Sequence, residues 1–111
     1  MSYQKLCRTV IINGTNNNAG DNVIVPGGQL GAGIGSIRVW QLVLNSTGPN
    51  VITPKSGSTV VGGQIVHTGN GSSTTEQNIE QQWMQAASGQ DFVLNFTNGG
   101  VTTGTLWYTL A

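Results

Sequence analysis

An alternation of apolar and polar residues with a period of two is the feature that most constrains the fold of this chain. Within residues 91–97 every second residue is Phe or Leu, and a similar alternation returns within residues 103–110. Successive side chains of a β-strand point to opposite faces of a sheet, so this period indicates half-buried strands rather than helices. Residues 98–100 are Asn-Gly-Gly and predict a tight hairpin turn between the two strands.

Further short apolar runs predict the remaining strands. Turn-forming Gly, Pro, Asn and Ser residues separate these runs about every 8–12 residues, which is typical of a β-sandwich. The additional strands are expected at residues 4–12, 23–25, 34–45, 51–55, 59–61 and 64–67. Residues 69–75 are expected to form a polar loop, and residues 76–87 a short helical turn, a strand or an irregular crossing. We therefore predict an all-β antiparallel sandwich of seven to eight strands.

The length of the chain favours one domain. Its 111 residues can bury one core and are too few for two. We expect a single domain over residues 1–111, in which residues 1–20 form an N-terminal strand or arm and a flexible Asn-rich loop. Gly, Thr, Asn, Gln and Ser make up more than half of the chain, yet its large apolar residues fall into strand-like runs. This pattern favours a folded domain over disorder.

The low charge of the chain excludes several classes of partner. Only 7% of the residues are charged and the net charge is zero. Four Lys and Arg residues do not provide the basic patch that a nucleic acid or an anionic membrane requires. Residues 1–12 lack the apolar segment of a signal peptide, and Cys7 is the only cysteine. We expect a protein made in the cytoplasm with neither nucleic acid nor membrane as a partner.

Nucleophilic catalysis would depend on one histidine. His67 would have to work with Asp21 or Asp91 in a serine triad, or with Cys7 in a thiol pair. The chain contains no G-x-S-x-G nucleophile motif, and Cys7 lies in an expected strand, where a buried and inert thiol is commoner. We expect His67 to be a structural residue at a strand end, bonded to a backbone carbonyl.

Two other patterns carry little chemistry. Glu76 and Glu80 would share a face of a helix, but a solvated face explains them better than a glycosidase pair. The glycines at residues 31–35 precede a strand, and Ser36 replaces the last glycine of a dinucleotide fingerprint. No His, Cys, Asp or Glu residues have metal-ligand spacing. We predict no catalytic residue, no cofactor and no metal, and therefore no enzyme.

The strand expected at residues 34–45 is apolar on both faces if its alternation is regular. One face then carries Ile37, Val39 and Val43, and the other carries Trp40, Leu42 and Leu44. The outer row of the last strand also contains Trp107. The outer face of a lone sandwich is normally solvated, so a subunit contact is the simplest explanation, with an irregular register or a covering loop as alternatives. The predicted interface contains Ile37, Val39, Val43 and Trp107.

The three tryptophans allow a different function. Trp40, Trp83 and Trp107 would serve as a platform on which sugar rings stack, with Asn, Gln and Asp91 as polar neighbours. A carbohydrate-binding module is therefore an alternative. A tryptophan is more commonly an anchor of a core or an interface.

Four stretches between residues 37 and 108 resemble a known family. They are residues 37–45, residues 55–59 with 62–65, Trp83 with residues 87–95, and residues 101–108. In strand pattern and turn placement they are similar to the small β-sandwich decoration, or cement, proteins of tailed-bacteriophage heads. The resemblance covers about two thirds of the chain and includes no catalytic signature.

The resemblance implies a fold and a role. It implies a jelly-roll sandwich that forms homotrimers on the outer surface of the virion shell. Each trimer would bridge subunits of the major capsid protein and stabilise the shell. The resemblance identifies no capsid-contacting residue. Another virion part, such as a tail or fibre receptor-binding module, is a further alternative.

Overall fold

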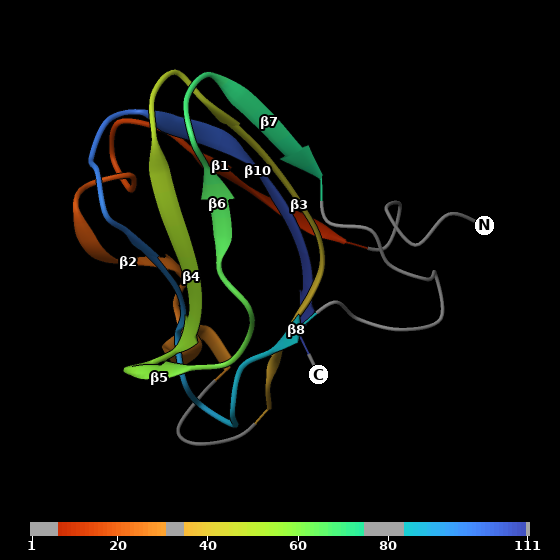
Figure 1. The fold of residues 1–111 in the computed structure, drawn as a ribbon. Helices are drawn as coiled ribbons and strands as arrows, with labels where there is room; N and C mark the ends of the chain where they lie inside the picture. The colour runs from red at the N-terminus through yellow and green to blue at the C-terminus, as the bar shows by residue number, and fades with distance from the viewer. Residues whose placement is uncertain (1–6, 31–34, 75–83, 111) are drawn as a thin grey trace.

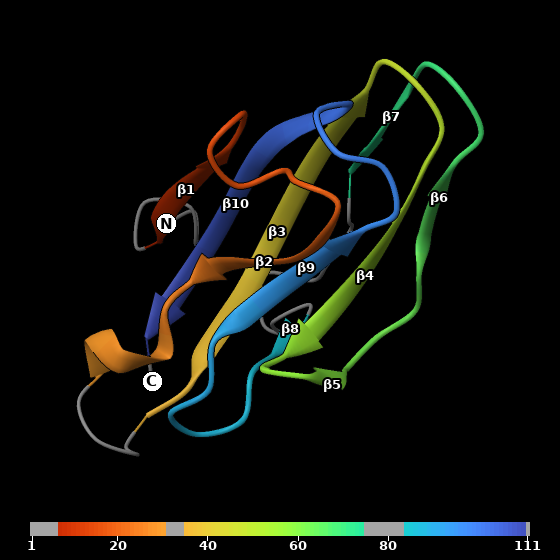
Figure 2. The same ribbon diagram turned by 90° about the vertical axis from the view of Figure 1, so that its left-hand side faces the viewer.

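The chain forms two antiparallel sheets that pack face to face. The computed structural model describes residues 7–30, 35–74 and 84–110. Within these residues each sheet has five strands. The two layers lie side by side in Figure 1, and one lies in front of the other in Figure 2. The predicted all-β antiparallel sandwich is confirmed.

Two sets of strands make up the layers, which we call sheet A and sheet B. Sheet A has the order β1-β10-β3-β7, with β8 also paired to β3. Its strands are β1 (Arg8–Ile12), β3 (Ile37–Ser46), β7 (Gly71–Thr74), β8 (Met84–Gln85) and β10 (Thr102–Leu110). Sheet B has the order β2-β9-β4-β5, with β6 also paired to β4. Its strands are β2 (Gly20–Val25), β4 (Asn50–Ser56), β5 (Thr59–Val60), β6 (Ile65–His67) and β9 (Phe92–Phe96), and the 3₁₀ helix η2 (Gly27–Leu30) follows β2.

The connectivity is that of a jelly roll. Four antiparallel pairs are nested along the chain: β1 with β10, β2 with β9, β3 with β7, and β4 with β6. These pairs alternate between sheet A and sheet B, as a long hairpin does when it is wound around a barrel axis. The winding brings β10 beside β3 and β9 beside β4, which completes the two layers.

The segment between β9 and β10 is not the tight hairpin that its Asn-Gly-Gly sequence predicted. The two strands belong to different sheets, so residues 97–101 cross from one layer to the other. The backbone N–H groups of the crossing bond to β4 and to the Asn-rich loop: Thr97 donates to the Val51 carbonyl at 3.2 Å, and Gly100 donates to the Asn17 carbonyl at 2.9 Å. Gly100 has a φ of 76°, a left-handed conformation that favours glycine.

Two other segments differ from the prediction or lie beyond it. Residues 71–74 form the strand β7 rather than a loop, because they pair with β3 at residues 43–46. The segment predicted at 76–87 falls mostly on residues 75–83, which are outside the described residues. Its described end forms β8, which pairs with Arg38 and Val39.

The Asn-rich loop, predicted to be flexible, is bonded to its surroundings. The Asn16 side chain accepts a hydrogen bond from the Asn13 N–H at 2.8 Å. Asn17 is buried and donates to the carbonyl of Thr102 at 2.7 Å, which fixes the loop to the start of β10. Residues 1–6 of the predicted N-terminal arm lie outside the described residues.

The core lies between the two sheets. Strand β9 contributes Phe92, Leu94 and Phe96, each at most 1% exposed. Sheet A supplies the opposite wall from β1, β3 and β10, with Ile12, Leu42 and Leu106 fully buried. Burial of each such side chain contributes roughly 1.5–3 kcal/mol, so this layer is the main source of stability.

Candidate interaction surface

A β-bulge interrupts β3 at Trp40. Tyr108 of β10 pairs with Val39, whereas the preceding Trp107 pairs with Gln41. Trp40 is therefore the extra residue of β3 at this shift of the register. A bulge of this kind reverses the alternation of side chains along the strand that contains it.

The bulge corrects the prediction of a strand that is apolar on two faces. Before it, Ile37 and Val39 point into the core, and after it Leu42 and Leu44 do so. All four side chains are fully buried. Of the alternatives open to the sequence, the irregular register is the one found. Ile37 and Val39 are therefore removed from the predicted interface, while Val43 lies on the outer face of sheet A.

The outer face of sheet A carries Val43 and Trp107, the two residues that remain of the predicted interface. Trp107 lies there because its neighbours along β10, Leu106 and Tyr108, are buried in the core. Two rows of paired residues cross the centre of this face: Ile11, Thr105 and Val43 in one, and Thr9, Trp107 and Gln41 in the other.

Trp40 joins Trp107 on this face. Its indole Nε1 donates a hydrogen bond to the Thr109 hydroxyl at 2.8 Å, and Thr109 belongs to the outer row of β10. Both tryptophans are half-buried. Two of the three tryptophans proposed as a sugar platform therefore lie on one face. The third, Trp83, lies outside the described residues.

The same face combines apolar side chains with uncharged polar ones and is weakly charged. Ile11 is 57% exposed and Val43 is half-buried. Arg38 is the one charged side chain on the described part of this face, and it pairs across the sheet with Thr109 and Gln85. Its Nε atom is buried and has no hydrogen-bond partner. A surface of this composition is suited to a protein contact rather than to free solvation.

His67 takes part in a buried polar network. Its Nδ1 atom lies 2.5 Å from the Ser46 hydroxyl, which lies 2.7 Å from the Thr102 hydroxyl. Asn50 donates to the same Thr102 oxygen at 2.8 Å. All four residues are buried, and Ser46 is only 5% exposed, so a substrate has no access to its hydroxyl. The network links the two sheets through side chains that are all buried.

The acids proposed as partners of His67 have other contacts. Asp21 forms an ion pair with Lys55 at 2.8 Å and accepts a hydrogen bond from Asn95 at 2.7 Å, on the outer face of sheet B. These two hydrogen bonds hold the pKa of Asp21 below its ordinary value. Asp91 accepts a hydrogen bond from the Gly27 N–H at 2.8 Å.

The remaining candidates are placed apart or not described. Cys7 is a free, half-buried thiol just before β1, and burial raises its pKa. Glu76 and Glu80 lie outside the described residues, as do residues 31–34 of the glycine-rich segment. Within residues 7–30, 35–74 and 84–110, no three His, Cys, Asp or Glu side chains gather as metal ligands would. The described part also contains no helix long and apolar enough to cross a membrane.

The outer face of sheet A thus carries Val43 and Trp107 of the predicted interface, together with Trp40 and Ile11. Comparison with known proteins adds no relative. The chain matches no protein-family model, no curated protein and no solved structure.

Proposed function

We propose that this protein is a structural protein that assembles as a homotrimer and decorates the outside of a phage head. The observation that carries the proposal is the outer face of sheet A, where Trp40, Trp107, Val43 and Ile11 lie outside the core. The jelly-roll topology adds support, since this fold recurs in viral capsid and lectin domains. Fold alone does not assign a function, so the outer face is the stronger support.

The outer face is suited to contact between subunits. Tryptophans at the centre of an interface commonly supply much of its binding energy. In a ring of three subunits each contact is heterologous, so this face of one copy would meet a different surface of the next. The proposed contact retains Val43 and Trp107 and adds Trp40 and Ile11, which replace the buried Ile37 and Val39.

Trimer formation explains how a weakly charged protein would bind stably to the capsid shell. Each trimer would present three equivalent contacts to the major capsid protein. Linked contacts raise the overall affinity without any one of them being strong. Bridging of neighbouring capsid subunits would then stabilise the shell.

The proposal is tested by binding to undecorated heads of tailed phages. Purified protein is mixed with heads, and the bound fraction is measured after sedimentation. The variant Trp107→Thr is expected to lose binding, because it removes the central aromatic side chain but keeps a residue favourable to β-strands. The control is Val23→Thr, since Val23 is an exposed residue of sheet B (49% exposed). Failure of the wild-type protein to bind heads, or equal binding by both variants, would contradict the proposal.

The second candidate function is carbohydrate binding. The position of Trp40 and Trp107 on one face, with Thr9, Gln41 and Thr105 beside them, favours it. A panel of glycans, followed by tryptophan fluorescence, distinguishes the two functions. If one glycan quenches the fluorescence in a saturable way and Trp107→Thr abolishes the effect, the protein is a carbohydrate-binding module. Unchanged fluorescence supports the structural role. A tail or fibre receptor-binding module would instead co-purify with tails rather than with heads.

A further inference from the structure

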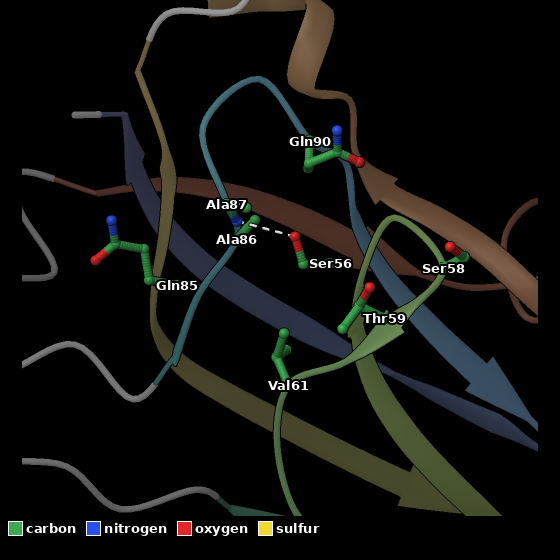
Figure 3. Close-up of a pocket in the computed structure, with 8 residues that line it drawn as sticks. All are labelled: Ser56, Ser58, Thr59, Val61, Gln85, Ala86, Ala87 and Gln90. Atoms are coloured by element: carbon green, nitrogen blue, oxygen red, sulfur yellow. Dashed lines mark hydrogen bonds between the residues drawn. The ribbon is translucent and has the colours of Figure 1, made fainter.

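A pocket lies between β5 and β8 at one edge of the sandwich. Its volume is about 590 Å³, which is within the range of small-ligand sites. One wall is formed by the turn after β4 and by β5, and the other by β8 and the loop that follows it (Figure 3). The lining residues are Ser56, Ser58, Thr59, Val61, Gln85, Ala86, Ala87 and Gln90.

The walls of this pocket are fixed by backbone and side-chain contacts. Gly57, between Ser56 and Ser58, has a φ of 58° and donates its N–H to the Asp91 carbonyl at 2.9 Å. The Gln90 side chain lies directly against Gly57, so closely that a Cβ at Gly57 would meet its Oε1 atom. The Ser56 hydroxyl accepts the N–H of Ala87 at 2.9 Å, which joins the two walls. The pocket is therefore formed before any ligand binds.

The lining of the pocket combines polar and apolar side chains and carries no charge. Its polar side chains are hydroxyls and amides, each able both to donate and to accept hydrogen bonds. In Figure 3 the Thr59 and Val61 side chains point toward Ala86 and Ala87, whereas the Gln85 amide is turned away. The side chains of Val61 and Ala87 give an apolar wall beside the polar groups, whereas Ala86 is fully buried.

We propose that this pocket binds a neutral sugar, such as one hexose unit of a glycan. Each sugar hydroxyl both donates and accepts hydrogen bonds, which matches Ser58, Thr59 and Gln90. The C–H face of the ring would lie on the half-buried Val61 and the exposed Ala87. A carboxylate, a phosphate or an ammonium group would find no opposite charge here to offset its loss of hydration. The inference goes beyond the proposed role as a trimer, because neither Trp40 nor Trp107 lines the pocket.

The test is a titration of the ¹⁵N-labelled full-length protein, followed by two-dimensional NMR. The probes are glucose, galactose, mannose and N-acetylglucosamine, with glucuronate and glucosamine as charged counterparts. We expect one neutral sugar to shift the amide signals of Ser58, Thr59 and Gln90 in a saturable way. The charged counterparts are expected to bind at least tenfold more weakly.

Matched variants separate the pocket from the rest of the surface. Thr59 and Gln90 are exposed, so Thr59→Val and Gln90→Ala are expected to fold normally and to raise Kd at least tenfold. Gln64→Ala is the control, because Gln64 is an exposed glutamine that does not line the pocket. Absence of shifts at the pocket with all four neutral sugars would overturn the inference, and so would equal binding of charged and neutral sugars. Head binding and oligomeric mass, measured on the same variants, are expected to be unchanged, which keeps this test separate from that of the trimer.

Discussion

The Nδ1 atom of His67 lies 2.5 Å from the Oγ atom of Ser46, and the two residues belong to different sheets. Ser46 ends β3 of sheet A, and His67 ends β6 of sheet B. Thr102 of sheet A and Asn50 of sheet B extend the same network. Buried polar groups of this kind are costly when one partner is removed. The network therefore joins the sheets at one end of the sandwich, where the apolar core stops.

Thr102→Val is expected to destabilise the protein by about 1–3 kcal/mol. The change preserves the shape of the side chain but leaves Asn50 and Ser46 without the hydroxyl that they share. Urea unfolding measures the loss. Thr103→Val is the control, because Thr103 is the exposed neighbour of the fully buried Thr102. Equal stability of the two variants would show that the network contributes nothing.

Gly104→Ala is expected to destabilise the protein by about 1–3 kcal/mol, the cost of overpacking. A Cβ at Gly104 would meet the backbone carbonyl oxygen of Val43 on the neighbouring strand, and that atom moves only if β3 moves. Gly14→Ala is the matched control, since a Cβ at Gly14 meets nothing within 4 Å. Thermal unfolding of both variants checks the prediction. An unchanged midpoint for Gly104→Ala would mean that β10 and β3 pair less closely than described.

Asp21 is expected to contribute a small, pH-dependent part of the stability. Hydrogen bonds from Lys55 and Asn95 lower its pKa in the folded protein. The contribution is therefore present above the pKa of the unfolded chain and is lost as the pH falls through the lower folded pKa. Its size is limited because the Asp21 side chain is 45% exposed to solvent. Asp21→Asn is expected to melt below the wild type at about pH 6 and together with it at about pH 2. A difference that grows toward low pH would contradict this account.

The thiol of Cys7 is expected to react slowly with alkylating reagents. Burial disfavours the thiolate, so the pKa of Cys7 is raised in the folded protein. The rate of reaction with iodoacetamide, followed across pH, is expected to reach its half-maximum at a higher pH than in the urea-unfolded chain. The unfolded chain is the internal control. A folded thiol that reacts faster than the unfolded one would show that Cys7 is activated rather than protected.

The sequence was most informative where local pattern and tertiary environment agree. The alternation around Phe92, Leu94 and Phe96 predicted a half-buried strand, and β9 is that strand. Alternation also placed Trp107 correctly on an outer face. In each of these strands, alternate residues lie on opposite faces of one sheet, so a period of two in the sequence is enough to assign each residue to a face.

Prediction failed where one extra residue or one distant partner decides the structure. The bulge at Trp40 reverses the alternation of β3, and nothing in residues 37–45 marks where the extra residue stands. Asn98-Gly99-Gly100 has the composition of a hairpin turn, yet the strands on either side of it, β9 and β10, belong to different sheets. The reason is that β9 pairs with β2 and β4. The pocket was missed for the same reason, since Thr59 and Gln90 meet only through the winding of the chain.

The oligomeric mass tests the central claim most directly. Light scattering after size exclusion is expected to give three times the 11.6 kDa of one chain for the wild type and for the control Val23→Thr. Trp107→Thr is expected to give the mass of one chain while its circular dichroism stays that of a folded β-protein, because loss of a central tryptophan costs an interface at least about 2 kcal/mol. A wild-type protein with the mass of one chain at every concentration would contradict the proposed trimer.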